Sequence, residues 1–535
     1  MICSSSTIFR TRAIAAALSV LALLTPVVGP AQGTASADLL ARARDALVRG
    51  DGIAAEVPLR EAVRKGVPPD VVRAALGEAL LLQGEWREAG EVLYGGSFAQ
   101  DSAARGWQMR GRLEMAQGRL ANAGQAFDQS LRIDNAVASL WTDIARLRFA
   151  GGEQAQAAEA AERAVRLAPS DPRALELRGL LIREQFGLQA ALPWFEAGLR
   201  HAPEDVGLLG EYAATLGDLG QYRAMLVVCR KLAKVDPGNV RALYLQAVLA
   251  ARAGQTTLAR KILLQAGAPL RDVPAAILLN GILEYRAGNA NLAVEHFDRL
   301  VRMQPDNFQA RVLLVRALRA RRLDVQAMQA AEAWVDLDAA PPYLLQLAAQ
   351  ANRALGRTAQ ADDMSASAAR SGQYPPWPLP AGQPAGVLAI DYGEAPGQAS
   401  TAVPYIRALI AEGDERQAIA VADRLRMANP GTAEAWLVAG DARLMAGEML
   451  GALDMYGRSA LIRFSLPALQ RIDHALRLMD RDAQANAVVA RYLRQNPRSP
   501  QALKLLSDGR AAVGDDDGAA RIEDFLKARG LRNSS

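Results

Sequence analysis

The stretch GNANLAVEHFDRLVRMQPDN, residues 288–307, combines a glycine turn, one amphipathic helix and a helix stop at Pro305. Similar stops occur upstream in LAPSD, HAPED and VDPGN, which contain Pro169, Pro203 and Pro237. The steps between the four prolines are 34, 34 and 68 residues, and the last step is twice 34. A fixed period of this length is typical of an array of helix–turn–helix repeats.

Five columns of a 34-residue frame hold their residue type from about residue 36 to about residue 375, which is ten units. Small residues at positions 8 and 20 let the two helices of a unit approach, and a larger apolar residue at position 24 fills the gap between units. Glycine at position 15 allows the positive φ that ends the first helix. Proline at position 32 ends the second helix, and an Asp, Asn or Ser just after it can cap the next one. The position-24 residues are Leu93, Phe127, Ala161, Phe195, Cys229, Leu263 and Phe297.

The pattern resembles the tetratricopeptide repeat family. WQMRG (107–111) and WLVAG (436–440) carry the start of that family's motif, and Trp141 occupies the same position 4. Glycine at 8, alanine at 20, phenylalanine at 24 and proline at 32 complete the likeness, although tyrosine is nearly absent from position 11. The resemblance implies an all-α fold, a right-handed superhelical α-solenoid of about fourteen helix-turn-helix units in two arrays.

Two arrays are predicted because the repeat pattern breaks once. Residues 38–373 form a first array of about ten units, and residues 399–532 a second array of about four. Between them lies YPPWPLPAGQPAGVLAIDYGEAPGQ (374–398), which has six prolines and is expected to be extended or polyproline-like. This segment is either a stiff linker or a clasp in which Trp377 and VLAIDY (387–392) pack on the solenoid.

The N-terminus, residues 1–37, is predicted to be a secretory signal peptide. It has two arginines, an apolar stretch over 13–24 and a small-residue cleavage site at Ala35-Ser36-Ala37. The protein is therefore expected to be exported, periplasmic or extracellular, and associated with the outer membrane in one version of this hypothesis. An uncleaved anchor is the alternative; in the cleaved chain no transmembrane segment is expected. Cys229 is then the single mature cysteine and is expected to be a buried hydrophobe.

The search for chemistry in the sequence is negative. The chain has 62 basic and 57 acidic side chains, and because these are interleaved along the helices no nucleic-acid partner is expected. Its three histidines, His201, His296 and His474, have no partner at metal-ligand spacing, and neither a P-loop nor a nucleophile elbow occurs. We expect no enzyme activity, no cofactor and no metal.

The resemblance implies that positions 2, 5, 9, 12 and 13 of each unit point into a concave groove. An exposed apolar strip in such a place usually marks a binding surface. The apolar residues at these positions in three successive units are Tyr244, Val248, Leu278, Ile282, Tyr285 and Val312. Arginines at position 9 flank them, namely Arg112, Arg146 and Arg316, together with Arg44 and Arg407, and Arg173 and Arg241 occupy position 2. The alternative is that such arginines are solvated or paired with Glu78, Glu176 and Glu211.

Three functional hypotheses follow. The first is a non-enzymatic exported scaffold that binds protein partners in this groove, similar in architecture to bacterial repeat proteins of envelope or exopolysaccharide assembly and export. The second is a solenoid that binds polysaccharide directly, with tyrosines against sugar faces. The third is an assembly chaperone or adaptor for periplasmic proteins.

Overall fold

The computed structural model describes residues 30–305, 307–335, 340, 342–370 and 382–528. These residues form 29 α-helices, α1 to α29, and no strand, so the predicted all-α solenoid of repeated helix pairs is confirmed. The chain divides into two compact units, one up to Gln117 and one from Gly118 onward. None of the helices in the described ranges is long and apolar enough to cross a membrane.

The first unit contains five helices and one 3-10 turn, Gln100–Ser102. Its buried core is built from aliphatic residues such as Leu59, Leu80 and Leu93. Residues 1–29 of the predicted signal peptide lie outside the described residues, and the rest of it begins α1. The helices of this unit are α1 (Pro30–Val48), α2 (Gly52–Arg64), α3 (Pro69–Gln83), α4 (Trp86–Tyr94) and α5 (Ala103–Ala116).

The second unit continues the repeat pairs. Within it the first helices of the first array are α7, α9, α11, α13, α15, α17 and α19, and each is followed by its second helix. The bounds are α6 (Leu120–Ile133), α7 (Ala138–Ala150), α8 (Gln154–Leu167), α9 (Pro172–Phe186), α10 (Leu188–His201), α11 (Val206–Asp218), α12 (Tyr222–Val235), α13 (Val240–Arg252), α14 (Thr256–Ala266), α15 (Pro274–Arg286), α16 (Ala290–Met303), α17 (Phe308–Ala320), α18 (Asp324–Val335), α19 (Pro342–Ala354) and α20 (Thr358–Arg370).

Beyond residue 381 one extra helix precedes four further pairs. Ordinary cap chemistry starts several of these helices; for example, the Asp414 side chain accepts from the amide of Gln417. The bounds are α21 (Ala385–Glu394), α22 (Ala399–Ala411), α23 (Glu415–Ala428), α24 (Ala433–Met445), α25 (Met449–Ile462), α26 (Leu466–Leu478), α27 (Asp482–Gln495), α28 (Pro500–Ala512) and α29 (Asp516–Ala528).

The local columns of the frame behave as predicted. Glycines at position 15, such as Gly220 and Gly288, have φ values of 74° and 82°. Three units have another residue there: Arg322 and Asp480 also adopt positive φ, at 56°, whereas Phe186 is the last residue of α9 and the next residue, Gly187, has a φ of 109°. The predicted caps form as well: Asn239, which follows Pro237, accepts from the amide of Ala242 at 2.9 Å.

The prediction for residues 374–398 is wrong in its second half. Residues 385–394 form the helix α21, in which Leu388 and Tyr392 are buried. The Tyr392 ring packs on Tyr405 of α22 with centroids 5.0 Å apart, so α21 covers the first pair of the second array. Trp377, the other half of the predicted clasp, lies outside the described residues.

The second array touches the first array along a row of turns, which we call the seam. Phe464, in the α25–α26 turn, donates its amide to the carbonyl of Gln185 in α9 at 3.1 Å. One repeat earlier, Thr432 donates to the carbonyl of Gly152 at 2.6 Å. One repeat later, Arg498 donates to the carbonyl of Gly220 at 3.0 Å.

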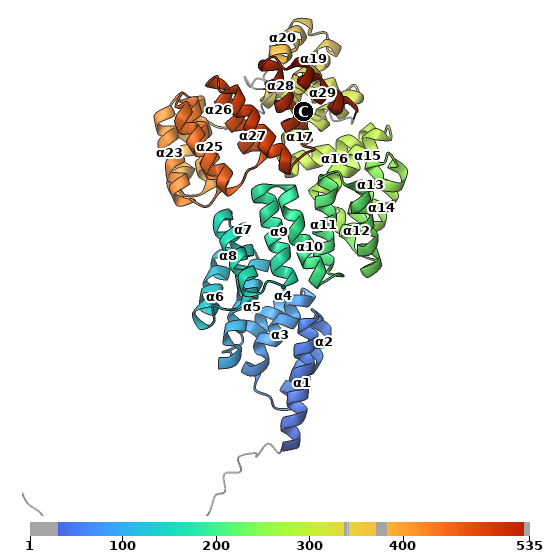
Figure 1. The fold of residues 1–535 in the computed structure, drawn as a ribbon, viewed down its shortest axis with the longest axis vertical. Helices are drawn as coiled ribbons and strands as arrows, with labels where there is room; N and C mark the ends of the chain where they lie inside the picture. Colours follow the sequence, from blue (N-terminus) through green and yellow to red (C-terminus); the bar gives the residue numbers. More distant parts are fainter. Residues whose placement is uncertain (1–29, 306, 336–339, 341, 371–381, 529–535) are drawn as a thin grey trace, which may run out of the picture. The chain divides into compact units, whose positions relative to one another are not determined.

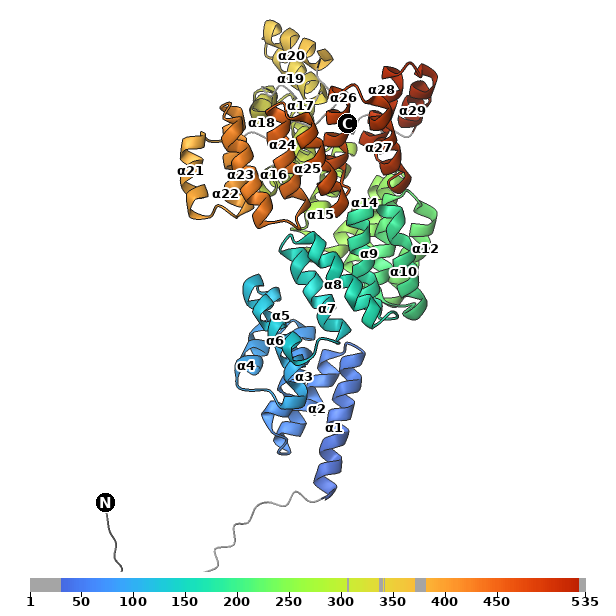
Figure 2. The same ribbon diagram turned by 60° about the vertical axis from the view of Figure 1, so that its left-hand side comes forward.

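α25 contacts α9 and α27 contacts α10. Both views draw these orange to red helices of the second array above α9 and α10 (Figure 1, Figure 2). Residues Gly152 and Thr432 are 280 positions apart, or roughly eight repeats of 34. The solenoid of the second unit therefore returns to its own edge after about eight repeats, and three successive turns meet in matching register.

Candidate functional site

The six predicted apolar residues lie on three successive first helices, and we call them the first-helix strip. Tyr244 and Val248 lie on α13, Leu278, Ile282 and Tyr285 on α15, and Val312 on α17. All six are partly exposed. Each also packs against buried core residues, since Val248 contacts the cluster around Leu263, and Ile282 and Val312 contact the cluster around Phe297. The strip is thus the accessible edge of the core.

One predicted arginine joins this strip directly. The guanidinium of Arg316, on α17, lies 5.0 Å from the centroid of the Tyr285 ring, and its Nε lies 3.3 Å from the Tyr285 hydroxyl oxygen. Stacking of this kind contributes on the order of 0.5–1 kcal/mol at exposed sites. It links α15 to α17 and keeps a cation at the end of the apolar surface.

A charged border occupies the preceding first helices. Glu211, on α11, pairs with Arg183 of α9 at 3.1 Å and with Arg241 of α13 at 2.7 Å. Arg183 also donates to the hydroxyl of Thr215 at 3.0 Å. The side chain of Glu211 is 12% exposed, so its two arginines satisfy a mostly buried carboxylate. These pairs hold three successive first helices in register.

Two further carboxyl groups belong to this border. Burial raises the pKa of Asp218, at the end of α11, while the nearby Arg183 and Arg252 oppose the rise. Burial also raises the pKa of Glu176 on α9, and Arg146 partly offsets that shift. Asp218 and Glu176 are therefore protonated more easily than ordinary surface carboxyls.

Two further predicted arginines, Arg112 and Arg146, face acidic neighbours. Arg146 lies 4.0 Å from Asp143 on its own helix. Arg112 lies 4.0 Å from Glu78. Arg112 belongs to the first unit, whereas the six strip residues, Arg146 and Arg316 belong to the second unit. The alternative considered from the sequence, pairing with Glu78, Glu176 and Glu211, thus matches the surroundings of Arg112, Arg146 and Arg241.

Sequence reasoning did not identify Arg183 and Asp218 as members of the charged border. Arg183 and Asp218 occupy positions 12 and 13 of neighbouring units, which are among the groove positions implied by the resemblance. A search for opposite charges 28 to 35 residues apart would have found Arg183 with Asp218, and also with Glu211 at position 6 of its unit.

The remaining nucleophile and imidazole candidates are packing residues. Cys229 is fully buried, as predicted, and burial raises its pKa to about 11. Burial also lowers the pKa of His296 and of His474. In the part of the chain that the structure describes, no group of three or more His, Cys, Asp or Glu residues could hold a metal ion.

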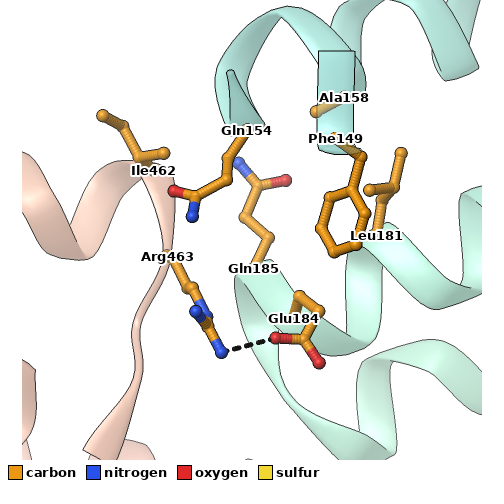
Figure 3. Close-up of a pocket in the computed structure, with 8 residues that line it drawn as sticks. All are labelled: Phe149, Gln154, Ala158, Leu181, Glu184, Gln185, Ile462 and Arg463. Atoms are coloured by element: carbon orange, nitrogen blue, oxygen red, sulfur yellow. Dashed lines mark ion pairs between the residues drawn. The ribbon is translucent and has the colours of Figure 1, made fainter. Parts of the chain in front are cut away.

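A small cavity of about 230 Å³ opens at the seam. Figure 3 shows its two sides, with Phe149 and Leu181 from the first array and Ile462 from the second. Arg463 crosses it to Glu184 at 2.7 Å and also pairs with Glu434 of the second array at 2.9 Å. Because the cavity is small and bridged by this ion pair, it is a feature of the contact between the arrays.

Models of the tetratricopeptide repeat family match four segments of the chain, residues 104–137, 142–206, 278–343 and 406–465. No curated protein matches it. Solved structures with a similar fold include a tetratricopeptide repeat protein from Parabacteroides merdae, at 19% identity, covering 44% of this chain and 93% of that one, with a TM-score of 0.33. PilF of Pseudomonas aeruginosa has 17% identity, covers 39% of this chain and 95% of that one, and has a TM-score of 0.34. The Cut9–Hcn1 structure has 14% identity, coverages of 89% and 96%, and a TM-score of 0.35.

The matched segments include pairs from both arrays, and the helix pairs between them follow the same 34-residue frame. The described residues therefore form a solenoid of helix pairs, and four segments of the chain are similar to the tetratricopeptide repeat.

Proposed function

We propose that this chain is an exported, non-enzymatic scaffold whose first-helix strip binds a protein partner during assembly or export at a bacterial envelope. Tetratricopeptide repeats generally serve as non-enzymatic scaffolds for protein–protein interaction. The predicted signal peptide is what supports export.

One observation supports the choice of the first-helix strip as the binding surface. Six apolar side chains on α13, α15 and α17 are all partly exposed, although the core beneath them is already filled by Leu263, Phe297 and their neighbours. Contiguous apolar surface of this kind commonly marks an interaction site. The strip extends across three repeats, so an extended peptide segment lying across successive first helices fits it better than a compact ligand does.

The charges beside the strip indicate which charged group the partner carries. Glu211 is neutralised by two arginines, whereas Arg316 at the other end stacks on a neutral ring. Among the described residues Arg316 has no carboxylate partner in an ion pair, so its positive charge beside the apolar surface favours a segment that carries a carboxylate next to its apolar residues.

Site-specific photocrosslinking tests this proposal. A photoreactive residue at Val248 or at Val312 is expected to capture the same protein in cells, because both positions are partly exposed on the strip. Ile390, on α21, is 68% exposed and serves as the control position. Capture at Ile390 but at neither strip position would contradict the proposal.

A second measurement separates protein from polysaccharide. The Val248→Asp/Val312→Asp variant should lose the captured protein while its circular dichroism stays unchanged. If titration with the source organism's polysaccharide instead shifts tryptophan fluorescence of the wild type but not of this variant, the polysaccharide hypothesis replaces ours.

A further inference from the structure

Positive charge is concentrated in one part of the solenoid. Residues 219–270 contain eight Lys or Arg side chains and one acidic residue, Asp236, a formal charge of +7 in a chain whose total is +5. Among the second helices described in residues 118–535, α12 and α14 alone contain no Asp or Glu. Because positive and negative charges nearly balance over the whole chain, the net charge alone does not reveal this basic segment.

The two helices enclose a groove, which we call the basic groove. It has a volume of about 930 Å³ and lies between α12 and α14, with the end of α13 as its floor. Leu226 of α12 and Leu258 and Ile262 of α14 line it. Leu226 and Leu258 remain 38% and 45% exposed, so the groove presents apolar surface to solvent.

Cations from one helix form the rim of the groove. Arg223, Arg230 and Lys234 all line it from α12, and all three are exposed. Within the described residues none of the three takes part in an ion pair, whereas Arg252, which also lines the groove, lies near Asp218. These three positive charges are therefore available to a ligand.

The rim charges do not help the fold. Arg230 and Lys234 are four residues apart on one helix face, and like charges at this spacing destabilise a helix by roughly 0.2–0.5 kcal/mol. No carboxylate on α12 compensates for them. Because these like charges destabilise the helix that carries them, their presence is better explained by a role in binding.

We propose that the basic groove binds an acidic amphipathic helix of a partner protein. The apolar stripe of such a helix would cover Leu226, Leu258 and Ile262, while its carboxylates would meet the α12 cations. A helix laid in an apolar groove is an established recognition mode, and the span from Tyr222 to Lys234 corresponds to about 18 Å, or three turns. None of the six residues of the first-helix strip lines the groove, so this site is separate from the strip.

The shape of the groove favours a helix over a membrane surface as its ligand. A flat anionic bilayer would be attracted by the same cations, but it would leave Ile262 and the floor of the groove uncovered. A helix can enter the space between α12 and α14 and bury these side chains.

Fluorescence anisotropy with the full chain tests the proposal. The probe is a labelled 15-residue helical peptide with leucine and alanine on one face and glutamate on the other; the control peptide has lysine in place of glutamate. We expect the glutamate peptide to bind, the lysine peptide to bind at least tenfold more weakly, and added salt to weaken the binding. Equal binding of the two peptides would overturn the proposal.

Matched variants locate the site. Arg230→Glu/Lys234→Glu should weaken glutamate-peptide binding at least tenfold. Arg416→Glu/Arg424→Glu on α23 makes the same charge change at exposed positions and should leave it unchanged. Equal weakening by both variants would overturn the proposal, because it would reveal a general charge effect. Sedimentation with phosphatidylglycerol vesicles in the absence of peptide binding would also overturn it, in favour of a membrane surface.

Discussion

The contact between positions 8 and 24 of a repeat offers a sharp test of the packing. In the repeat formed by α15 and α16, Gly281 faces the ring of Phe297, which is 1% exposed. A Cβ added to Gly281 would lie 2.5–2.9 Å from three ring atoms. Where position 8 is alanine, the partner is smaller, as in the clusters that join Ala213 with Cys229 and Ala247 with Leu263.

Two opposing effects determine how much Gly281→Ala changes the local stability of the repeat. Alanine gains about 1 kcal/mol over glycine in a helix interior. Overpacking a filled core costs about 1–3 kcal/mol, and the enclosed ring has little room to retreat. We therefore expect a net loss of up to about 2 kcal/mol of local stability. Phe297→Leu alone should also cost about 1–2 kcal/mol. The double variant should lose less than the sum, with a coupling of about 1–2 kcal/mol, because leucine makes room for the methyl group.

Hydrogen exchange by mass spectrometry on peptides of α15 and α16 is the suitable assay. Repeat arrays open locally, so one global free energy of unfolding does not describe them. In the regime where exchange follows the opening equilibrium, a change of about 1.4 kcal/mol alters the exchange rate tenfold.

Gly457, in α25, provides the matched control for this substitution. A Cβ there would have no neighbour within 4 Å, so Gly457→Ala should slow exchange. If Gly281→Ala also slows exchange, or if the double variant is additive within about 0.5 kcal/mol, the steric account of the two columns is wrong.

Four further predictions follow from single side chains. Tyr456→Phe removes a 2.8 Å hydrogen bond to the buried Asp441 and should cost about 1–3 kcal/mol in α24 and α25, measured by hydrogen exchange; no change would contradict it. Burial raises the pKa of Cys229 to about 11, so its thiol should react with Ellman's reagent near pH 8 only after unfolding. Arg463→Glu places like charges beside two glutamates and should speed exchange in the seam turns, less so in high salt; unchanged exchange would show that the ion pairs do not hold the seam. Burial raises the pKa of Glu176, so its ionisation opposes folding above the ordinary carboxyl pKa; Glu176→Gln should slow exchange in α9 near pH 7 but have little effect near pH 3.5, and the opposite order would refute this sign.

The helix pairs were predictable because their signals are local. A glycine at position 15 and a proline at position 32 act on the residues next to them, so Gly288 and Pro305 bound α16 in sequence and in structure alike. The error at 374–398 came from averaging over the whole segment. Five of its six prolines lie at or before Pro384, which directly precedes α21, and the sixth, Pro396, follows the helix, so the ten residues of α21 contain none.

The binding surfaces were only partly predictable. The register of the repeat assigned Tyr285 and Arg316 to one face, and the structure brings them together because neighbouring units stack with a constant offset. The basic groove was missed because charge was judged over the whole chain. Its rim and its apolar walls come from two helices whose separation is set by the packing of α13 between them.

The sequence by itself determined the repeat, its turns and the apolar face of each helix, since these depend on residues within about one 34-residue period. Only the tertiary structure decided which turns form the seam. Thr432 and Arg463 look like ordinary surface residues in the sequence, yet they contact partners about 280 residues away. That pairing depends on the small rotation between successive units, which adds up over roughly eight repeats and which no single repeat encodes.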